Sequence, residues 1–212
     1  MSVVLPSPLA SYAHPCPQHP DMQADFRQLR HQTKNTLATI MLRVSQCLET
    51  GGCHNLAAEV ERRIMLAARI SNALFGLTQA PGPFAGRLRS LCDSMVGLLG
   101  DPTQEIETVV DVQPGVPANL ETLLLRAAHE LVGNAIKHGL HMRLIGCIEV
   151  AVTSDADGTV LVVSDDGWDY ERSFLPGEGL QIVGVLAQPF GGQVSLRRCG
   201  DRTLATLRVP GP

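Results

Sequence analysis

A polar pattern runs through residues 129–139 (HELVGNAIKHG). Four side chains stand at i, i+4, i+7 and i+8, so a helix would carry all of them on one face: Glu130, Asn134, Lys137 and His138. An amide oxygen can ligate Mg²⁺, and lysine and histidine can contact phosphate oxygens. The pattern therefore predicts a site for a metal-bound polyphosphate, although the solvated face of an amphipathic helix is the commoner origin of such charges.

A second motif, Asp165-Asp166-Gly167, directly follows the strand-like run 160–164 (VLVVS). A carboxylate at the end of a strand can accept a hydrogen bond from an exocyclic amine such as that of adenine. A glycine two residues later lets the backbone approach the ring closely. We therefore expect Asp165 to hold a nucleotide base, while a plain turn between two strands would explain the same residues.

A third motif, Gly177-Glu178-Gly179-Leu180, opens the apolar stretch 180–186. Glycines at the start of a helix leave backbone N–H groups open to an anion, and the helix dipole favours negative charge at that end. The spacing does not match the dinucleotide-binding fingerprint, and the phosphate-loop lysine motif is absent. Taken alone, this G-x-G is weak support for a phosphate site.

The elements that must position these motifs are predicted by their periodicity. We expect strands over 106–112, 147–153, 159–164, 194–198 and 204–209, and helices over 87–99, 120–138 and 179–190. Asp157-Gly158 has the chemistry of a hairpin turn. The pattern predicts an antiparallel sheet covered on one face by helices, which belongs to the α+β class.

The preceding half of the chain has a different period. Apolar residues recur about every 3.5 residues from Met22 to Leu48 and again from Leu56 to Leu77, with Gly51-Gly52 between them. Two antiparallel helices joined by a tight turn cannot bury such a seam alone, so we expect a homodimeric four-helix bundle. Residues 81–83 (PGP) mark a boundary. The predicted divisions are a flexible proline-rich tail (1–20), a helical hairpin (21–80) and a second domain (86–212).

Composition excludes several classes of protein. Of the 212 residues, 44% are hydrophobic and 18% are charged, as in globular domains. A net charge of −4 argues against nucleic-acid binding. No apolar run approaches the roughly 20 residues that span a bilayer, so we expect no membrane insertion. The six cysteines have no metal-ligand spacing, and we expect reduced thiols in a cytoplasmic protein.

The order of the three motifs resembles the ATP-binding domain of the GHKL superfamily, which includes sensor histidine kinases, DNA gyrase and mismatch-repair ATPases. The resemblance covers residues from about 86 to 210 and implies the α/β sandwich (Bergerat) fold of that superfamily, with ATP and Mg²⁺ held under a mobile lid. By that match Asn134 would ligate Mg²⁺ and Asp165 would hold adenine. The remaining matched residues would surround the phosphates or shape the lid: Glu130, Lys137, His138, Gly167, Gly177, Gly179 and Leu180.

The chain departs from the superfamily pattern at one point. The pattern usually continues D-x-G-x-G, whereas here Asp169 follows Trp168 in place of the second glycine, and the lid (168–176) is short. An aspartate near a triphosphate adds like-charge repulsion and reduces backbone freedom. This departure predicts a lowered nucleotide affinity and, in the extreme, a site that binds no nucleotide.

His31 stands apart from the other histidines. On a helix it would lie about 200° from Leu29, away from the apolar seam. An exposed imidazole is a nucleophile near neutral pH, although most surface histidines are only solvated polar groups. Residues 31–37 (HQTKNTL) resemble the H-R-x-K-N-x-L phosphoacceptor box of one histidine-kinase subfamily, which implies phosphorylation of His31. Many histidine kinases carry an acid directly after the phosphorylated histidine, where this chain has Gln32.

These resemblances imply a soluble histidine kinase of a two-component phosphorelay. The γ-phosphoryl group of ATP would pass to His31, with Glu130 and Asn134 in the catalytic machinery, and then to an aspartate of a response-regulator receiver domain. Residues 1–20 are too short for a sensor domain, so the input would arrive through that tail, a separate sensor protein or the regulator. The alternative is a dimeric phosphotransfer or scaffold protein whose degenerate site does not use ATP. A serine kinase of the anti-sigma type ranks below both, because it would give no reason for the His31 box.

Overall fold

The computed structural model describes residues 40–42, 56–75, 82–167 and 178–211. The predicted tail, the segment around His31, the Gly51-Gly52 turn, the lid residues Trp168 and Asp169, and Gly177 lie outside the described residues. The first helix of the predicted hairpin therefore stays a prediction, apart from a short helical piece at residues 40–42.

The described elements follow the predicted order of helices and strands. The helices are α2 (Leu56–Phe75), α3 (Phe84–Leu99), α4 (Glu121–Asn134) and α5 (Glu178–Ala187), with short turns η1 (Ala118–Leu120), η2 (Ala135–Gly139) and η3 (Gln188–Phe190). The strands are β1 (Glu105–Val112), β2 (Ile145–Asp155), β3 (Gly158–Asp165), β4 (Gln193–Cys199) and β5 (Arg202–Pro210). None of these helices combines the length and the apolar character that crossing a membrane requires.

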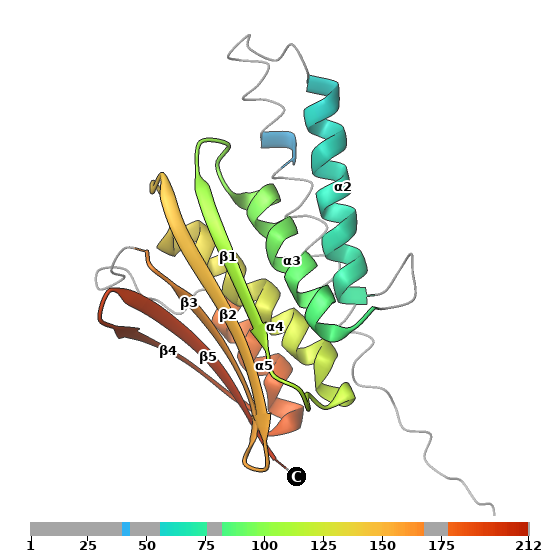
Figure 1. Cartoon of the computed structure of the whole chain (residues 1–212), viewed down its shortest axis with the longest axis vertical. Helices are drawn as coiled ribbons and strands as arrows, with labels where there is room; N and C mark the ends of the chain where they lie inside the picture. The colour runs from blue at the N-terminus through green and yellow to red at the C-terminus, as the bar shows by residue number, and fades with distance from the viewer. Residues whose placement is uncertain (1–39, 43–55, 76–81, 168–177, 212) are drawn as a thin grey trace, which may run out of the picture. The chain divides into compact units, whose positions relative to one another are not determined.

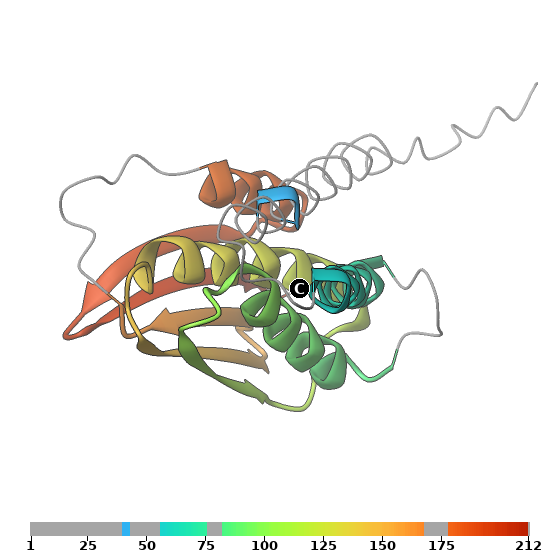
Figure 2. The ribbon, with the colours of Figure 1, turned by 90° about the horizontal axis from the view of Figure 1, so that it is seen from above.

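The five strands form one sheet in the order β1-β2-β3-β5-β4, and α3, α4 and α5 cover one of its faces (Figure 1, Figure 2). The expectation of a purely antiparallel sheet is wrong at one edge, because β1 pairs with β2 in parallel. The chain passes from β1 through α4 before it enters β2, and such a helical crossover returns the chain in the same direction. The remaining neighbours pair antiparallel.

The predicted β2–β3 hairpin is confirmed. Asp155 pairs with Gly158 across the turn, and Gly158 has φ +139°, a conformation that favours glycine. One Asp155 oxygen, Oδ1, accepts hydrogen bonds from the backbone N–H groups of Asp157 (2.9 Å) and Gly158 (3.1 Å). Local turn chemistry therefore fixes this hairpin and the register of β3 behind it.

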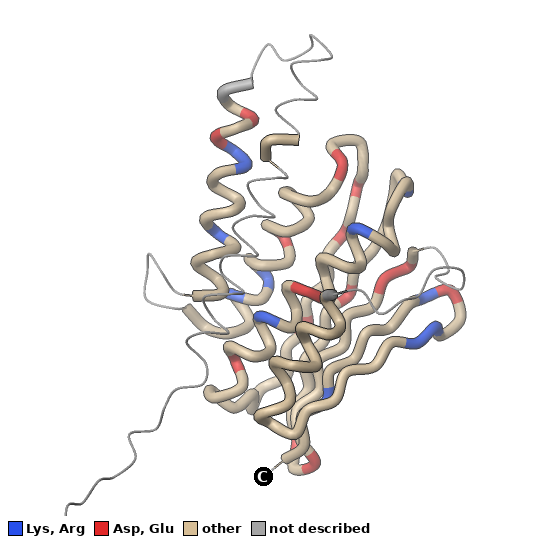
Figure 3. The backbone as a smooth tube through the Cα atoms, turned by 180° about the vertical axis from the view of Figure 1, so that it is seen from behind, with Lys and Arg blue, Asp and Glu red and all other residues tan. Residues whose placement is uncertain are grey.

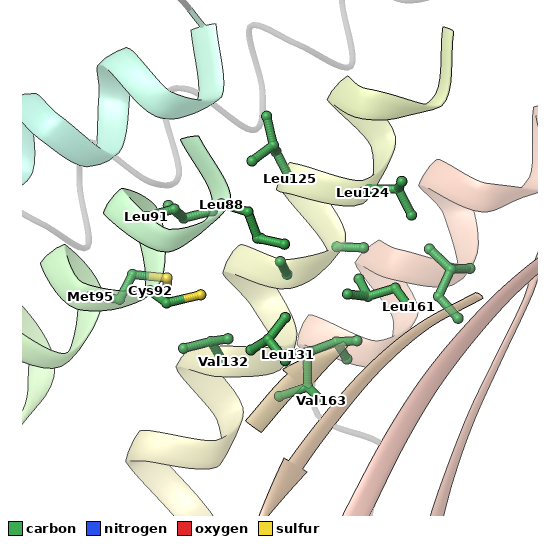
Figure 4. Close-up of a cluster of buried hydrophobic side chains, with 14 of the residues drawn as sticks. Leu88, Leu91, Cys92, Met95, Leu124, Leu125, Leu131, Val132, Leu161 and Val163 are labelled. Carbon is green, nitrogen blue, oxygen red and sulfur yellow. The ribbon is translucent and has the colours of Figure 1, made fainter. Parts of the chain in front are cut away.

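The core lies between the sheet and its helical layer (Figure 4). Helix α3 contributes Leu91 and Met95, α4 contributes Leu131, and β3 contributes Leu161 and Val163; none of these residues is more than 2% exposed. Helix α4 also has an apolar face, which is buried throughout: Leu123, Leu124, Ala127, Leu131 and Ala135. Burial of this face orients the opposite, polar face of α4 away from the core.

Helix α2 packs along α3 within one compact unit, which runs from Thr39 to Pro212. Ile70 and Leu74 enter the common core. Arg63, only 1% exposed, pairs with Glu59 and donates to the carbonyl oxygen of Leu98 at 3.0 Å. The predicted seam position Ile64 is 53% exposed in the single chain.

Candidate functional site

The predicted motif helix is continuous in chain direction but changes its winding at Asn134. The α-helical part ends there, and residues 135–139 form a π-helical turn. Single π turns within helices occur frequently at functional sites. Glu130 and Asn134 are half-buried, whereas Lys137 and His138 on the π turn are exposed. The wider turn shifts the last two side chains from the register that an ideal α-helix predicts.

The E-x-x-x-N and G-x-G-L motifs meet where α4 passes α5. A Cβ atom built on Gly179 would lie 2.8 Å from Asn134 Nδ2 and 3.1 Å from Asn134 Oδ1. Gly179 is buried against this amide, so no larger residue fits without displacing Asn134. The first turn of α5 therefore begins directly beside the amide predicted to ligate Mg²⁺.

Asp165 ends strand β3 and is enclosed by two glycines. Its side chain is 4% exposed, and its Oδ1 accepts a hydrogen bond from the N–H of Gly167 at 3.0 Å. A Cβ atom on Gly139 would lie 2.3 Å from that same oxygen, and one on Gly167 would lie 2.2 Å from the carbonyl oxygen of Gly139. The end of the motif helix therefore packs directly on the Asp165 turn.

Gly139 is a site residue that the motif analysis missed. The sequence placed it only as the last residue of the HELVGNAIKHG run. Its contact with Asp165 joins two motifs that are distant in the chain, so no local pattern could have indicated it. The one available signal was a glycine directly after the polar helix face.

Burial determines the electrostatics at Asp165. We call this part of the site, where a nucleotide base is predicted to bind, the base end. The pKa of Asp165 is raised to about 6, mainly by desolvation and to a smaller extent by the adjacent Asp166 carboxylate. The Gly167 N–H group, Arg198 and Arg143 oppose this rise in pKa. Asp165 is therefore mostly a carboxylate at neutral pH. Protonation near pH 6 would remove its charge.

Two further site residues are shaped by their neighbours. Glu130 Oε1 lies 3.1 Å from Nδ1 of the adjacent His129, so an imidazole holds this carboxylate. The pKa of His138 is lowered by partial burial and by the positive charges of Lys137 and His141. His138 is therefore neutral at pH 7 and can donate one N–H to a phosphate oxygen without carrying charge.

The residues fit a magnesium ion that is bound mainly by phosphates. Within the described part of the chain, no group of three or more His, Cys, Asp and Glu side chains is placed to hold a metal. Mg²⁺ commonly takes one or two protein oxygens and completes its octahedron with water and substrate phosphates. If the predicted role of Asn134 holds, its half-buried amide beside the start of α5 would supply one such oxygen.

Comparison with known proteins found structures of similar fold but no match by sequence. No family model and no curated protein sequence matches the chain. A blue-light-activated histidine kinase of Erythrobacter litoralis is 18% identical, with a TM-score of 0.52 over 87% of this chain and 59% of its own length. A solved structure described as a bacterial phosphotransferase is 14% identical, with a TM-score of 0.53 over 85% of this chain and 92% of its own length.

These similarities establish the architecture. The mixed sheet with its helical layer has the fold of a histidine kinase catalytic core, as the motifs predicted. At identities this low, the likeness concerns the fold alone. Which chemistry the chain performs is therefore a question for its own residues.

Proposed function

We propose that this protein is an ATP-dependent protein-histidine kinase of a two-component phosphorelay. One observation supports this most strongly: three separate motifs converge on the C-terminal end of α4. Gly179 of α5 contacts Asn134, and Gly139 contacts Asp165 at the end of β3. A structural role for any one motif would not require all three to meet.

Each residue has a role that its surroundings permit. Asp165, a buried carboxylate at neutral pH, accepts a hydrogen bond from the adenine amine, with Gly167 beside the ring. Asn134 would hold Mg²⁺, which would neutralise charge that develops on the phosphates. In this proposal the remaining groups would surround the phosphates or shape the lid: Lys137, His138, Gly177, Gly179 and Leu180.

The transfer step is a phosphoryl exchange between oxygen and nitrogen. The bond between the γ-phosphorus and the β–γ bridging oxygen breaks, a bond from that phosphorus to a nitrogen of His31 forms, and ADP leaves. Glu130, held by His129, is the nearest described carboxylate to Asn134 along α4 and orients the reacting groups. The phosphoryl group then moves from His31 to an aspartate of a response-regulator receiver domain.

The assembly proposed for this kinase is a homodimer through the helical hairpin 21–80. Ile64 and Met65 of α2 are each 53% exposed in the single chain, as expected of a face that a second copy covers. We also propose a soluble, cytoplasmic protein, supported by the free thiols of the three described cysteines, Cys92, Cys147 and Cys199. A separate sensor protein would supply the signal.

A second candidate is a dimeric phosphotransfer protein that does not use ATP. Asp169, in place of the second glycine of D-x-G-x-G, favours it, as does Gln32 in place of an acid beside His31. One of the two solved structures compared above is described as a bacterial phosphotransferase. Such a protein would receive its phosphoryl group on His31 from a phospho-aspartate.

Labelling with radioactive ATP and Mg²⁺ separates the two candidates. We expect acid-labile label on the wild type, and its loss in His31→Ala and Asn134→Ala. Matched controls are His54→Ala and Asn119→Ala, the latter an exposed amide in η1. If the wild type takes no label from ATP but accepts phosphate on His31 from a phosphorylated receiver domain, the second candidate replaces the first. No label from either donor would overturn both.

A further inference from the structure

Two arginines approach the Asp165-Asp166-Gly167 turn from opposite sides of β3. Arg143 precedes β2, on one side of β3 in the sheet, and Arg198 lies near the end of β4, beyond β5 on the other side. Basic and acidic positions meet at this end of the sheet, next to the β4–β5 turn (Figure 3). Neither arginine belongs to the three glycine and acid motifs described above.

Arg143 fixes the middle residue of the turn. Its Nη1 donates to the carbonyl oxygen of Asp166, its Nη2 lies 3.5 Å from Asp166 Oδ2, and its Nε donates to the Ile145 carbonyl at 3.2 Å. The backbone N–H of Cys147 donates to Asp166 Oδ1 at 2.8 Å. Asp166 is thus held by main chain and side chain, with its carboxylate directed at β2.

Arg198 fixes the last residue of the turn. Its Nη1 donates to the Gly167 carbonyl at 3.0 Å and to Thr203 Oγ1 at 3.1 Å. Its Nε and Nη2 donate to the carbonyls of Gly200 and Asp201 in the β4–β5 turn, at 3.1 and 2.6 Å. All three guanidinium nitrogens therefore have acceptors. A lysine, with one ammonium group, could not satisfy this planar set.

Both arginines act on Asp165 through Gly167. Arg143 binds the carbonyl oxygen of the peptide before Gly167, and Arg198 binds the carbonyl oxygen of Gly167 itself. The N–H of Gly167 donates to Asp165 Oδ1, so the position of the Gly167 peptide sets the orientation of the carboxylate. Among the described residues, only this N–H donates to Asp165, and it uses Oδ1. The second oxygen, Oδ2, is the one left to accept from a base amine.

We propose that Arg143 and Arg198 are positioning residues of the base end of the site, clamping the turn so that the Asp165 carboxylate keeps one orientation toward the nucleotide base. The proposal rests on the proposed function for the identity of the ligand. The clamp itself is a property of the ligand-free protein. It can therefore be tested whether or not ATP binds.

The first measurement is the pKa of Asp165 in the ligand-free protein, followed by carboxyl-carbon NMR and assigned with Asp165→Asn. The charges that act on Asp165 are Asp166, Arg143 and Arg198. Removing either arginine as Arg143→Gln or Arg198→Gln should raise the pKa above its wild-type value of about 6. The matched control, Arg197→Gln on the same strand, should leave it unchanged. An unchanged pKa in both clamp variants would overturn the clamp even if ATP binds normally.

The second measurement separates charge from geometry through the affinity for Mg²⁺-ADP. We expect Arg198→Gln to bind ADP about tenfold more weakly, as the loss of one well-placed hydrogen bond implies. Arg198→Lys should restore the pKa of Asp165 but not the ADP affinity. If lysine restores both, charge alone acts and the positioning role is wrong. If wild type binds no ADP, the proposed kinase fails while the NMR result still decides the clamp.

A less disruptive substitution keeps the test valid if the arginine variants do not fold. Thr203→Val keeps Arg198 and nearly the same volume but removes one of its acceptors at a 5%-exposed position on β5. We expect a smaller loss of ADP affinity in the same direction, with a cooperative thermal transition retained. Full affinity in a folded Thr203→Val protein, together with full affinity in Arg198→Gln, would overturn the proposal.

Discussion

The two ends of the candidate site are built differently. At the base end, Asp165 is buried, enclosed by Gly139 and Gly167, and braced through the turn by two arginines. At the phosphate end, Lys137 and His138 are exposed on a π-helical turn. The base end is therefore organised before any ligand arrives, whereas the phosphate end relies on solvated side chains and on a metal that comes with the ligand. Substitutions should thus cost most at the base end.

The largest expected effect comes from Asp165→Asn. We expect loss of measurable Mg²⁺-ADP binding, because the amide no longer presents a charged acceptor, together with a more stable fold. The pKa of Asp165 rises from 3.8 to about 6 on folding, so ionisation costs at most about 3 kcal/mol of folding free energy. The wild type loses that stability as the pH rises through this range, and Asp165→Asn does not.

Chemical denaturation at pH 4 and pH 8 measures this change in stability. The variant should gain about 1–3 kcal/mol over the wild type at pH 8 and little at pH 4. Equal stability of the two proteins at pH 8, or a variant that is less stable there, would show that the burial of Asp165 is not what sets its pKa.

Gly139→Ala should have the next largest effect. The new methyl group must move the Asp165 carboxylate, from which an ideal Cβ would be 2.3 Å away, so we expect ADP affinity to fall about a hundredfold in a protein that still folds. The matched control is Gly86→Ala in α3, where an added Cβ has nothing within 4 Å. That variant should keep full affinity and gain about 0.5–1 kcal/mol in stability. Equal affinities would show that Gly139 does not shape the site.

Lys137→Ala should weaken binding less, by about three- to tenfold at low salt. Because Lys137 is exposed, its attraction for phosphates is screened, and the difference from wild type should shrink at high ionic strength. Titrations of ADP at two salt concentrations test this, with Lys137→Arg as the charge-preserving control. A loss as large as that of Gly139→Ala would contradict the contrast between the two ends.

The smallest effect concerns pH and His138. Its lowered pKa makes it neutral at pH 7, so His138→Ala should change ADP affinity less than about threefold there. Below pH 6 the two ends respond in opposite directions: protonation of Asp165 weakens binding, and protonation of His138 strengthens contact with phosphate. Wild-type affinity should therefore fall as the pH decreases from 7 to 5, and more steeply in His138→Ala. The same profile in both proteins would remove His138 from the site.

The two ends also differ in what the sequence could predict. The Asp165 turn and the Asp155–Gly158 hairpin depend on local strand and turn chemistry, so the sequence located both. The polar face of α4 followed from its periodicity as far as Asn134. The π turn after it was not predicted, and it ends at Gly139, which lies against Asp165 from a distant part of the chain.

Features formed by distant segments escaped prediction for the same reason. The parallel pairing of β1 and β2, the burial of Arg63 between α2 and α3, and the arginine clamp each join residues far apart in the chain. A single arginine forms no sequence pattern from which its hydrogen-bond acceptor could be predicted. Its role becomes visible only when the sheet order brings β2 and β4 to the two sides of β3.

The most direct test of this account is a calorimetric titration of Mg²⁺-ADP into the full chain, with Asp165→Asn measured alongside. The account predicts saturable binding of one nucleotide per chain by the wild type and none by the variant. Absence of binding by a folded wild-type protein would contradict the nucleotide site. Equal binding by both proteins would contradict the role of Asp165 within it.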